Sequence, residues 1–300
     1  MKKVLAINYS QTGQLDEIME RFLSPMVGVD VDRVKIQLKV PYGFPWDSDR
    51  FFEVMPESVM EEVVELQDFD LTHDAYDLIV LGYQPWFLSP SIPTTSLLKH
   101  EKFKAVIQGK PVVTVIGARN MWLNAQDSIR ALLSAAGARQ VANIPLIDRS
   151  NNLTSAVSIL HWMLNGKKTR PMGIFPKPGV SDEDIWQADR YGAFAKKALE
   201  TGEYDDLQRD VLSLDEIRIP TNILFIEMRA KKLFRIWARI IKKKGTTVAK
   251  RKRWLVGFKY YLIFALFVVS PIVLVIFNLF LRPFELGSIK RKKEYYCGVN

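Results

Sequence analysis

The stretch Val4-Leu5-Ala6-Ile7-Asn8-Tyr9 runs directly into Ser10-Gln11-Thr12-Gly13-Gln14, and helical spacing of apolar residues begins at Leu15. A buried strand followed by a small hydroxyl-rich turn and a helix predicts an anion site, because backbone N–H groups, hydroxyls and the helix dipole converge at the turn. The alternative is that Ser10 or Thr12 only caps the helix. The turn lacks the glycine spacing of a dinucleotide fold and the Gly-Lys-Ser/Thr ending of a nucleoside triphosphate loop.

The net positive charge of the chain comes entirely from its last quarter. Residues 1–227 hold 24 Lys and Arg against 31 Asp and Glu, a net charge of −7. Residues 228–300 hold 18 against 2, a net charge of +16, and together the two parts give +9. A basic segment can indicate nucleic-acid binding, but this one also contains an apolar run, so we expect a membrane and no nucleic acid as its partner.

That apolar run extends from Tyr260 to Leu281 and carries no charge. At about 1.5 Å per helical residue it can cross a hydrocarbon core of roughly 30 Å, whereas a buried core or dimerisation helix would rarely stay uncharged on all faces. Basic residues flank the run on both sides, which leaves its orientation open. Pro271 lies near its centre, and both a simple crossing and a re-entrant hairpin remain open.

The segment from Ile223 to Lys244 alternates large apolar residues with Arg and Lys, which predicts a basic amphipathic helix in the headgroup region or an ordinary surface helix packed on the core. Cys297 is the single cysteine, so no intrachain disulfide is expected. The first apolar run is too short for a signal peptide. We therefore expect the globular part to stay in the cytoplasm, on the cytoplasmic face of the membrane.

Apolar, β-branched runs alternate with helical patterns, which predicts an α/β fold with a parallel sheet. The expected strands and helices have the following bounds: strands 3–9, 31–40, 77–83, 111–117 and 141–148; helices 15–23, 97–108, 124–136 and 181–200. Gly137 is a plausible C-cap and Ser181 an N-cap. Five strands in about 200 residues fit the order 2-1-3-4-5, in which ligands bind at the carboxyl ends of strands one and three.

Two segments exceed such a minimal fold. Residues 41–57 carry Phe44, Trp46, Phe51 and Phe52, and residues 152–165 form an additional helix after the fifth strand. Either segment could cap a lipophilic substrate, although aromatic residues more often fill an ordinary core. The charge switch near Pro220 divides the chain into a globular domain, residues 1–220, and a basic membrane-associating tail, residues 221–300.

Two further turns follow predicted strands at the same edge of the sheet. After the third strand the chain reads Pro85-Trp86-Phe87-Leu88, whose flat apolar faces suit stacking on a planar ring. After the fourth strand it reads Gly117-Ala118-Arg119-Asn120-Met121, where Gly117 would admit a ligand to the backbone and Asn120 could hydrogen-bond its polar edge. Arg119 is either part of this loop's function or a surface ion-pair partner.

The turn at Ser10, Thr12 and Gly13 resembles the phosphate loop of flavodoxins, with Leu15 in place of the last Thr of that motif. The resemblance implies a flavodoxin-like five-stranded α/β fold and FMN as cofactor. It also implies a set of cofactor-binding residues: Ser10, Gln11, Thr12, Gly13, Gln14, Leu15, Pro85, Trp86, Phe87, Leu88, Gly117, Asn120 and Met121. No metal site and no nucleophilic triad is indicated, so the catalytic residues are left unassigned and hydride transfer to the flavin is expected.

The combination of residues 8–15, residues 82–86 and the tail ending Lys292-Lys293-Glu294-Tyr295-Tyr296-Cys297-Gly298 is similar to the flavodoxin-like aromatase, or dialkylresorcinol condensing enzyme, of bacterial dialkylresorcinol biosynthesis. That resemblance implies oxidation of a dialkylcyclohexanedione to a dialkylresorcinol, with a ketosynthase as partner and a lipophilic substrate beside the membrane. Two alternatives stay open: an NAD(P)H-dependent FMN quinone reductase, and a non-catalytic membrane-anchored electron carrier or scaffold. A homo-oligomer is also left open.

Overall fold

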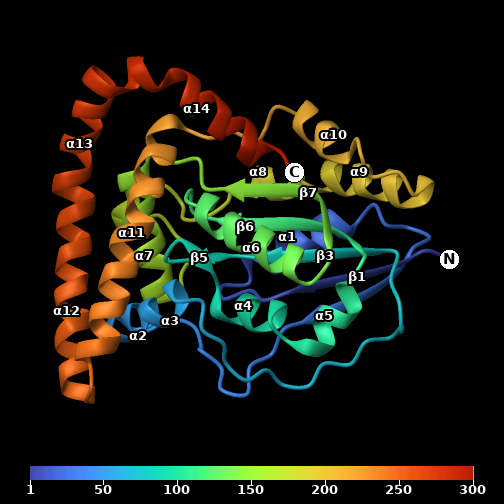
Figure 1. Ribbon diagram of the computed structural model, residues 1–300, viewed down its shortest axis with the longest axis horizontal. Helices are drawn as coiled ribbons and strands as arrows, with labels where there is room; N and C mark the ends of the chain where they lie inside the picture. Colours follow the sequence, from blue (N-terminus) through green and yellow to red (C-terminus); the bar gives the residue numbers. More distant parts are fainter. Residues whose placement is uncertain (300) are drawn as a thin grey trace.

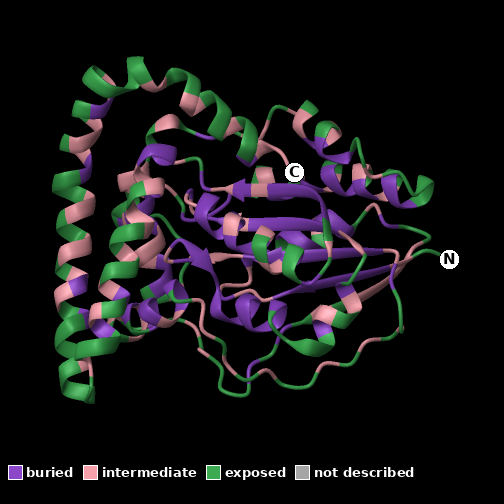
Figure 2. Ribbon diagram, in the orientation of Figure 1, coloured by how far each residue is buried: buried purple, intermediate pink, exposed green. Residues whose placement is uncertain are grey.

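The computed structural model describes residues 1–299 and centres on a parallel sheet. Its five strands lie in the order β2-β1-β3-β6-β7 and have the following bounds: β1 (Lys3–Asn8), β2 (Asp30–Lys35), β3 (Leu78–Tyr83), β6 (Pro111–Ala118) and β7 (Arg139–Ile147). Numbered by strand this is 2-1-3-4-5, the flavodoxin-like order, which confirms the predicted fold class. Figure 1 shows the strands side by side at the centre of the molecule, and Figure 2 shows that they are mostly buried.

Helices cover both faces of the sheet, so the body has three layers. One face packs against α1 (Gln14–Leu23), α8 (Asp182–Trp186), α9 (Ala188–Thr201) and α10 (Leu207–Ser213). The other packs against α4 (Ile92–Leu98), α5 (Glu101–Ile107) and α6 (Leu123–Ala135). The inner strands are apolar on both faces, as a doubly covered parallel sheet requires.

The two predicted insertions meet over the carboxyl edge of the sheet. Residues 41–57 form a loop that leads into α2 (Ser48–Glu53) and α3 (Met55–Val59), and the later insertion is α7 (Asn152–Asn165), as predicted. The backbone N–H of Trp46 donates to the carbonyl of Met163, 2.9 Å away. Both insertions therefore lie at the ligand-binding edge of this fold.

Three predicted elements were wrong in their extent. Strand β2 ends at Lys35 and not at residue 40, because its only partner β1 ends opposite it at Asn8. The helix expected over 97–108 is divided at His100 into α4 and α5, and the break lets Leu97 and Leu98 of α4 and Phe103 and Ile107 of α5 all pack into the core on this face of the sheet. The helix expected over 181–200 is divided at Gln187. At this break Arg21 Nε donates a hydrogen bond of 2.7 Å to the carbonyl of Trp186.

The tail is mostly helical, with a break at residues 245–247, and lies along one side of the body (Figure 1). Its segments are α11 (Thr221–Lys244), α12 (Val248–Phe264), a π-helical segment η2 (Ala265–Val269), α13 (Ser270–Ile276), a second π-helical segment η3 (Phe277–Leu281) and α14 (Arg282–Cys297). The chain reverses between α11 and α12, helical geometry then continues through Pro271, and the chain turns again near the start of α14. Remaining elements are the short strands β4 (Pro85–Trp86) and β5 (Ser89–Pro90) and the single 3₁₀ turn η1 (Pro171–Gly173).

Helix α1 approaches α9 so closely that a side chain at Gly192 would overlap the carbonyl oxygen of Phe22. We expect Gly192→Ala to lower the free energy of unfolding by about 1–3 kcal/mol or more, because a backbone atom cannot move aside as a flexible side chain can. Thermal unfolding of the detergent-purified protein measures this, with Gly287→Ala as control, because Gly287 is also helical and an added Cβ there would meet only the Arg291 side chain at 3.7 Å. Equal stability of Gly192→Ala and the wild type would contradict this packing.

Candidate functional site

The turn after β1 presents three unpaired backbone N–H groups. Gly13 has a φ of 85°, in the left-handed region, and this conformation turns the chain into α1. Within the described residues 1–299, no hydrogen bond is made by the N–H groups of Thr12, Gly13 and Gln14. Since these groups stand at a helix N-terminus, the turn forms a concave donor site for an anion.

The two hydroxyls of this turn differ in what they do. Ser10 Oγ accepts the backbone N–H of Leu15 at 3.2 Å, so Ser10 does cap α1, and its own proton remains free to donate. The Thr12 side chain takes part in no hydrogen bond within residues 1–299. Thr12 is therefore the residue that has no evident role inside the fold.

The remaining predicted residues of the turn have structural partners for their side chains. Gln14 forms a reciprocal pair with the Val180 backbone, donating at 3.0 Å and accepting at 2.9 Å, and Leu15 is buried in the core. The Gln11 side chain donates to the carbonyl of Gly43 in the first insertion. Since the N–H groups of Gln11 and Leu15 are also engaged, by Gln84 and Ser10, only Gln14 of these three can offer a ligand a free backbone N–H, which sequence reasoning could not show.

The second predicted loop is a tight hairpin. Pro85–Trp86 pairs antiparallel with Ser89–Pro90, and the two residues between them, Phe87 and Leu88, have φ values of 47° and 66°. Positive φ is unfavourable for such side chains and costs of the order of 1–2 kcal/mol per residue. The hairpin is therefore a strained turn that the surrounding packing must hold.

Trp86 stands in a cluster of aromatic rings at the carboxyl edge of the sheet. Its ring centroid lies 5.0 Å from that of Trp46, 5.3 Å from Tyr42 and 6.0 Å from Tyr9, all in edge-to-face geometry. With the Gln84 amide oriented to satisfy both donors, its oxygen accepts the Trp86 indole N–H and the Gln11 backbone N–H. The hairpin and the turn after β1 are thus joined through Gln84.

Phe87 connects the same hairpin to the tail. Its ring centroid is 5.2 Å from Phe51 of α2, 6.4 Å from Phe234 of α11 and 6.4 Å from Phe258 of α12. The strained turn therefore packs against both α11 and α12 of the tail. A movement of the tail would disturb the loop at this edge of the sheet.

The third predicted loop follows β6 and carries a buried polar group without a partner. Asn120 Nδ2 donates to Asn152 Oδ1 at 3.0 Å, whereas Asn120 Oδ1 makes no hydrogen bond. Arg119 also donates to Asn152, at 2.9 Å to its carbonyl, so it binds α7 and is not a surface ion-pair partner. Gly117 faces α1, where an added Cβ would make ordinary van der Waals contact with Leu15 and Ile18 at 3.4 Å. Met121 is half-buried beside Asn120.

Sequence reasoning missed Glu227, the one acidic residue in the basic helix α11. Glu227 is fully buried, and its Oε1 accepts the backbone N–H of Asn124 at 2.8 Å. It therefore caps α6, directly after the third loop, from a different helix, while its Oε2 has no partner. Burial raises the pKa of Glu227 to about 8, against the hydrogen bonds from α6, which lower it.

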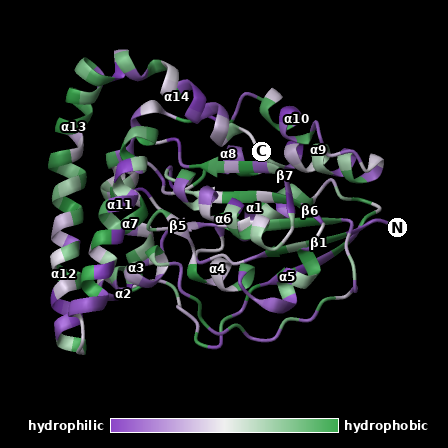
Figure 3. Cartoon of the chain, in the orientation of Figure 1, coloured by the Kyte–Doolittle hydropathy of each residue, from purple (hydrophilic) through white to green (hydrophobic). Residues whose placement is uncertain are grey.

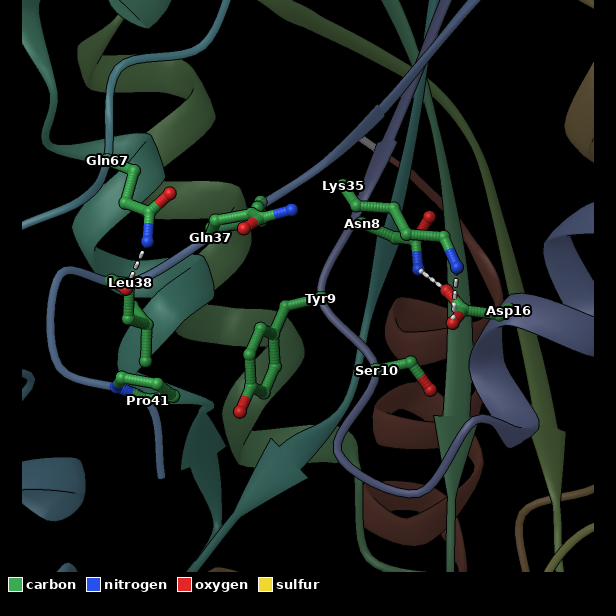
Figure 4. A pocket seen from close by; sticks show the side chains of 10 residues that line it. Asn8, Tyr9, Ser10, Asp16, Lys35, Gln37, Leu38, Pro41 and Gln67 are labelled. Carbon is green, nitrogen blue, oxygen red and sulfur yellow. Dashed lines mark hydrogen bonds and ion pairs between the residues drawn. The ribbon is translucent and has the colours of Figure 1, made fainter. Parts of the chain in front are cut away.

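A cavity of about 240 Å³ adjoins the turn on the side of β2. Figure 4 shows Asp16 pointing to Asn8 and Lys35 at its wall, with Asp16 Oδ1 2.7 Å from Asn8 Nδ2 and Oδ2 2.9 Å from Lys35 Nζ. Ser10 is the one predicted site residue in its lining. The hairpin and the third loop lie across β1 from this cavity, at the carboxyl ends of β3 and β6.

No protein-family model and no curated protein matches this sequence. Similar solved structures include a flavoprotein in complex with FMN from Lactobacillus acidophilus NCFM (18% identity over 48% of this chain and 93% of that chain, TM-score 0.38). A flavodoxin of Streptococcus pneumonia TIGR4 is 14% identical over 65% of this chain and 99% of that chain, with a TM-score of 0.34. A flavone reductase is 14% identical over 68% of this chain and 65% of that chain, with a TM-score of 0.40. The flavodoxin-like class of this chain follows from its own strand order.

The buried carboxyl of Glu227 predicts a pH-dependent stability. Because its pKa rises from 4.5 to about 8 on folding, the folded state keeps a proton that the unfolded chain has lost between those pH values. The free energy of unfolding contributed by Glu227 therefore falls as pH rises through this window. Glu227→Gln keeps an acceptor for Asn124 but cannot titrate, so we expect its unfolding temperature to decline less than that of the wild type from about pH 5 to about pH 8.

Thermal melts at both pH values measure this difference, and Glu20→Gln, at an exposed position of α1, controls for loss of one negative charge. Parallel declines in Glu227→Gln and the wild type would show that Glu227 is already ionised in the folded protein.

Proposed function

We propose that this protein is an FMN-dependent oxidoreductase that removes two hydrogens from a dialkylcyclohexanedione to give a dialkylresorcinol at a membrane. The observation that carries the proposal is the trio of unpaired N–H groups at Thr12, Gly13 and Gln14 in a sheet of flavodoxin-like order. In the Lactobacillus acidophilus neighbour the bound ligand is FMN. The resemblance of residues 8–15 and 82–86 to the dialkylresorcinol aromatase supports the choice of substrate.

The residues present fit an FMN molecule at both of its ends. The N–H groups of the turn, together with the free hydroxyl of Thr12, would hold the phosphate, since charge-assisted hydrogen bonds from such donors are strong. The unpartnered Asn120 Oδ1 would accept an N–H from the polar edge of the ring. Trp86 and its aromatic neighbours supply the apolar surface beside the predicted ring position.

The reaction takes one hydride and one proton from the six-membered ring, and the remaining dienone tautomerises to the aromatic diol. FMN, when bound, supplies a two-electron acceptor for the hydride. The aromatic cluster and the two insertions over the carboxyl edge would exclude water from the reacting carbon. The dialkyl chains of such a substrate favour lipid over water by about 0.8 kcal/mol per buried CH₂, which suits an enzyme with an apolar tail.

The reaction is tested in a single anaerobic turnover. The detergent-purified protein, reconstituted with FMN, is mixed with a dialkylcyclohexanedione, and the visible absorbance of oxidised flavin is followed. We expect bleaching with formation of one equivalent of dialkylresorcinol. If the flavin stays oxidised with the dione but is bleached by NADPH, the aromatase reaction is contradicted and quinone reduction takes its place. A protein that retains no flavin would contradict the whole proposal.

The phosphate contact is tested at Thr12. Thr12→Val removes a hydroxyl without a partner in the fold, so we expect FMN affinity to fall by about 1–3 kcal/mol with no change in unfolding temperature. Thr169→Val, an exposed position remote from the turn in sequence, is the matched control and should bind FMN as the wild type does. Quenching of flavin fluorescence measures both variants; wild-type affinity in Thr12→Val would mean that this hydroxyl does not contact the phosphate.

A further inference from the structure

Both ends of the apolar segment are attached to the globular body. Before the segment, Arg251 Nη2 lies 2.8 Å from Glu57 Oε2 and Lys259 Nζ lies 2.9 Å from Ser48 Oγ. After it, the hydroxyl of Tyr296 donates to Asp127 at 2.8 Å. The carbonyl of Cys297 also accepts a bond of 2.6 Å from Gln208. The chain therefore leaves the body and returns to it around the apolar run.

The inner side of the segment packs along α11. Phe277 stacks on Phe225 with ring centroids 3.8 Å apart, and Asn278 donates to Asn222 at 3.0 Å. Lower down, Trp237 and Tyr261 have centroids 5.2 Å apart. Helices α12 and α13 and helix α11 thus form an antiparallel pair over most of their length, as Figure 1 shows.

The outer side of the segment is apolar and exposed. In the most apolar 18-residue window of this helix the mean hydropathy is 2.8, yet only 11% of that window is buried. Figures 2 and 3 show the exposed and hydrophobic character of α13 and of the upper part of α12. The exposed large residues of the run are here called the outer apolar face: Tyr260, Ile263, Phe264, Phe267, Val268, Val269, Ile272, Val275, Ile276, Leu279, Phe280 and Leu281.

A simple crossing would carry charge into the hydrocarbon core. Because α11 lies alongside, its Arg229, Lys232, Arg235 and Arg239 would enter the bilayer with the apolar segment. An Arg or Lys at the centre of a spanning helix is strongly unfavourable. An arrangement with the segment in the plane of the bilayer leaves these residues at the level of the headgroups.

We propose that α12 and α13 lie in the plane of an anionic membrane, with the outer apolar face in a single leaflet and both flanks on the side of the sheet. The net charge of +16 over residues 228–300 fits anionic headgroups, and the apolar face fits the acyl region beneath them. The two exposed apolar residues of α11, Leu233 and Ile236, extend the same contact. The protein is then monotopic: residues 1–220 and residues 295–299 share one compartment.

Sidedness is tested by cysteine labelling. In a Cys297→Ser background, Val299→Cys reports the far flank of the segment and Glu20→Cys reports the body. A membrane-impermeant maleimide is applied to intact spheroplasts and to inverted membrane vesicles of expressing cells. We expect both variants to be labelled in the inverted vesicles and neither in spheroplasts. Labelling of the two variants in opposite preparations would establish a crossing and overturn the proposal, whatever the outcome of the flavin experiments.

The leaflet contact is tested by flotation of the purified protein with vesicles of phosphatidylcholine, with or without phosphatidylglycerol. We expect binding to the anionic vesicles to fall at least tenfold in the double variant Phe267→Asp with Phe280→Asp. The matched control, Val27→Asp with Met172→Asp, changes two apolar residues of the body that are each 77% exposed and should bind as the wild type does. Unchanged flotation of the tail variant would overturn the assignment of this face to lipid. The assignment would also be overturned if the wild type were a dimer and the tail variant a monomer that still binds the vesicles.

Discussion

The left-handed turn at Gly13 is the constraint on which the site and the packing around it depend. Strand β1 pairs with β2 on one side and β3 on the other, so its end cannot move without disturbing the sheet. The turn must therefore reverse the chain into α1 within a few residues, and it does so at the cost of leaving three N–H groups unpaired. Helix α1 in turn packs so closely against α9 that Gly192 cannot carry a side chain without displacing the backbone at Phe22. A rigid turn with three free N–H donors follows from this geometry.

A second constraint links that site to the tail. The turn at Phe87 and Leu88 adopts backbone angles that neither residue favours, and it is held by aromatic contacts with α2, α11 and α12. Glu227 adds a polar contact of the same kind, because it reaches from α11 to the first residues of α6. Two of the three loops at the carboxyl edge are thus supported by helices of the basic tail. In the proposed function, membrane binding and the flavin pocket share these helices.

Much of the body could be predicted from local pattern alone. The strands, helix α7 and the amphipathic helix α11 follow from apolar periodicity and charge, and five parallel strands leave few topologies open. The end of β2 could not be predicted, since it depends on where its partner stops, and the break at His100 depends on which apolar side chains the sheet accepts.

The candidate site was predictable to a smaller extent. The turn at residues 10–14 was found because strand, hydroxyls and glycine are contiguous, whereas Glu227 lies more than 100 residues from the helix that it caps. The side-chain partners of Gln11 and Gln14 are equally distant in sequence or lie in insertions, so a local motif could not show that these amides are already engaged. The return of residues 295–298 to the body is a tertiary contact of the same kind.

The central claim is that the turn after β1 binds a phosphate. Isothermal titration calorimetry of the flavin-free protein with FMN and with riboflavin, which lacks only the phosphate, tests it most directly. Three backbone donors and one hydroxyl at a helix N-terminus predict that FMN binds at least about 100-fold more tightly than riboflavin, a difference of about 2.7 kcal/mol. Equal affinities would show that the unpaired N–H groups of Thr12, Gly13 and Gln14 do not hold a phosphate.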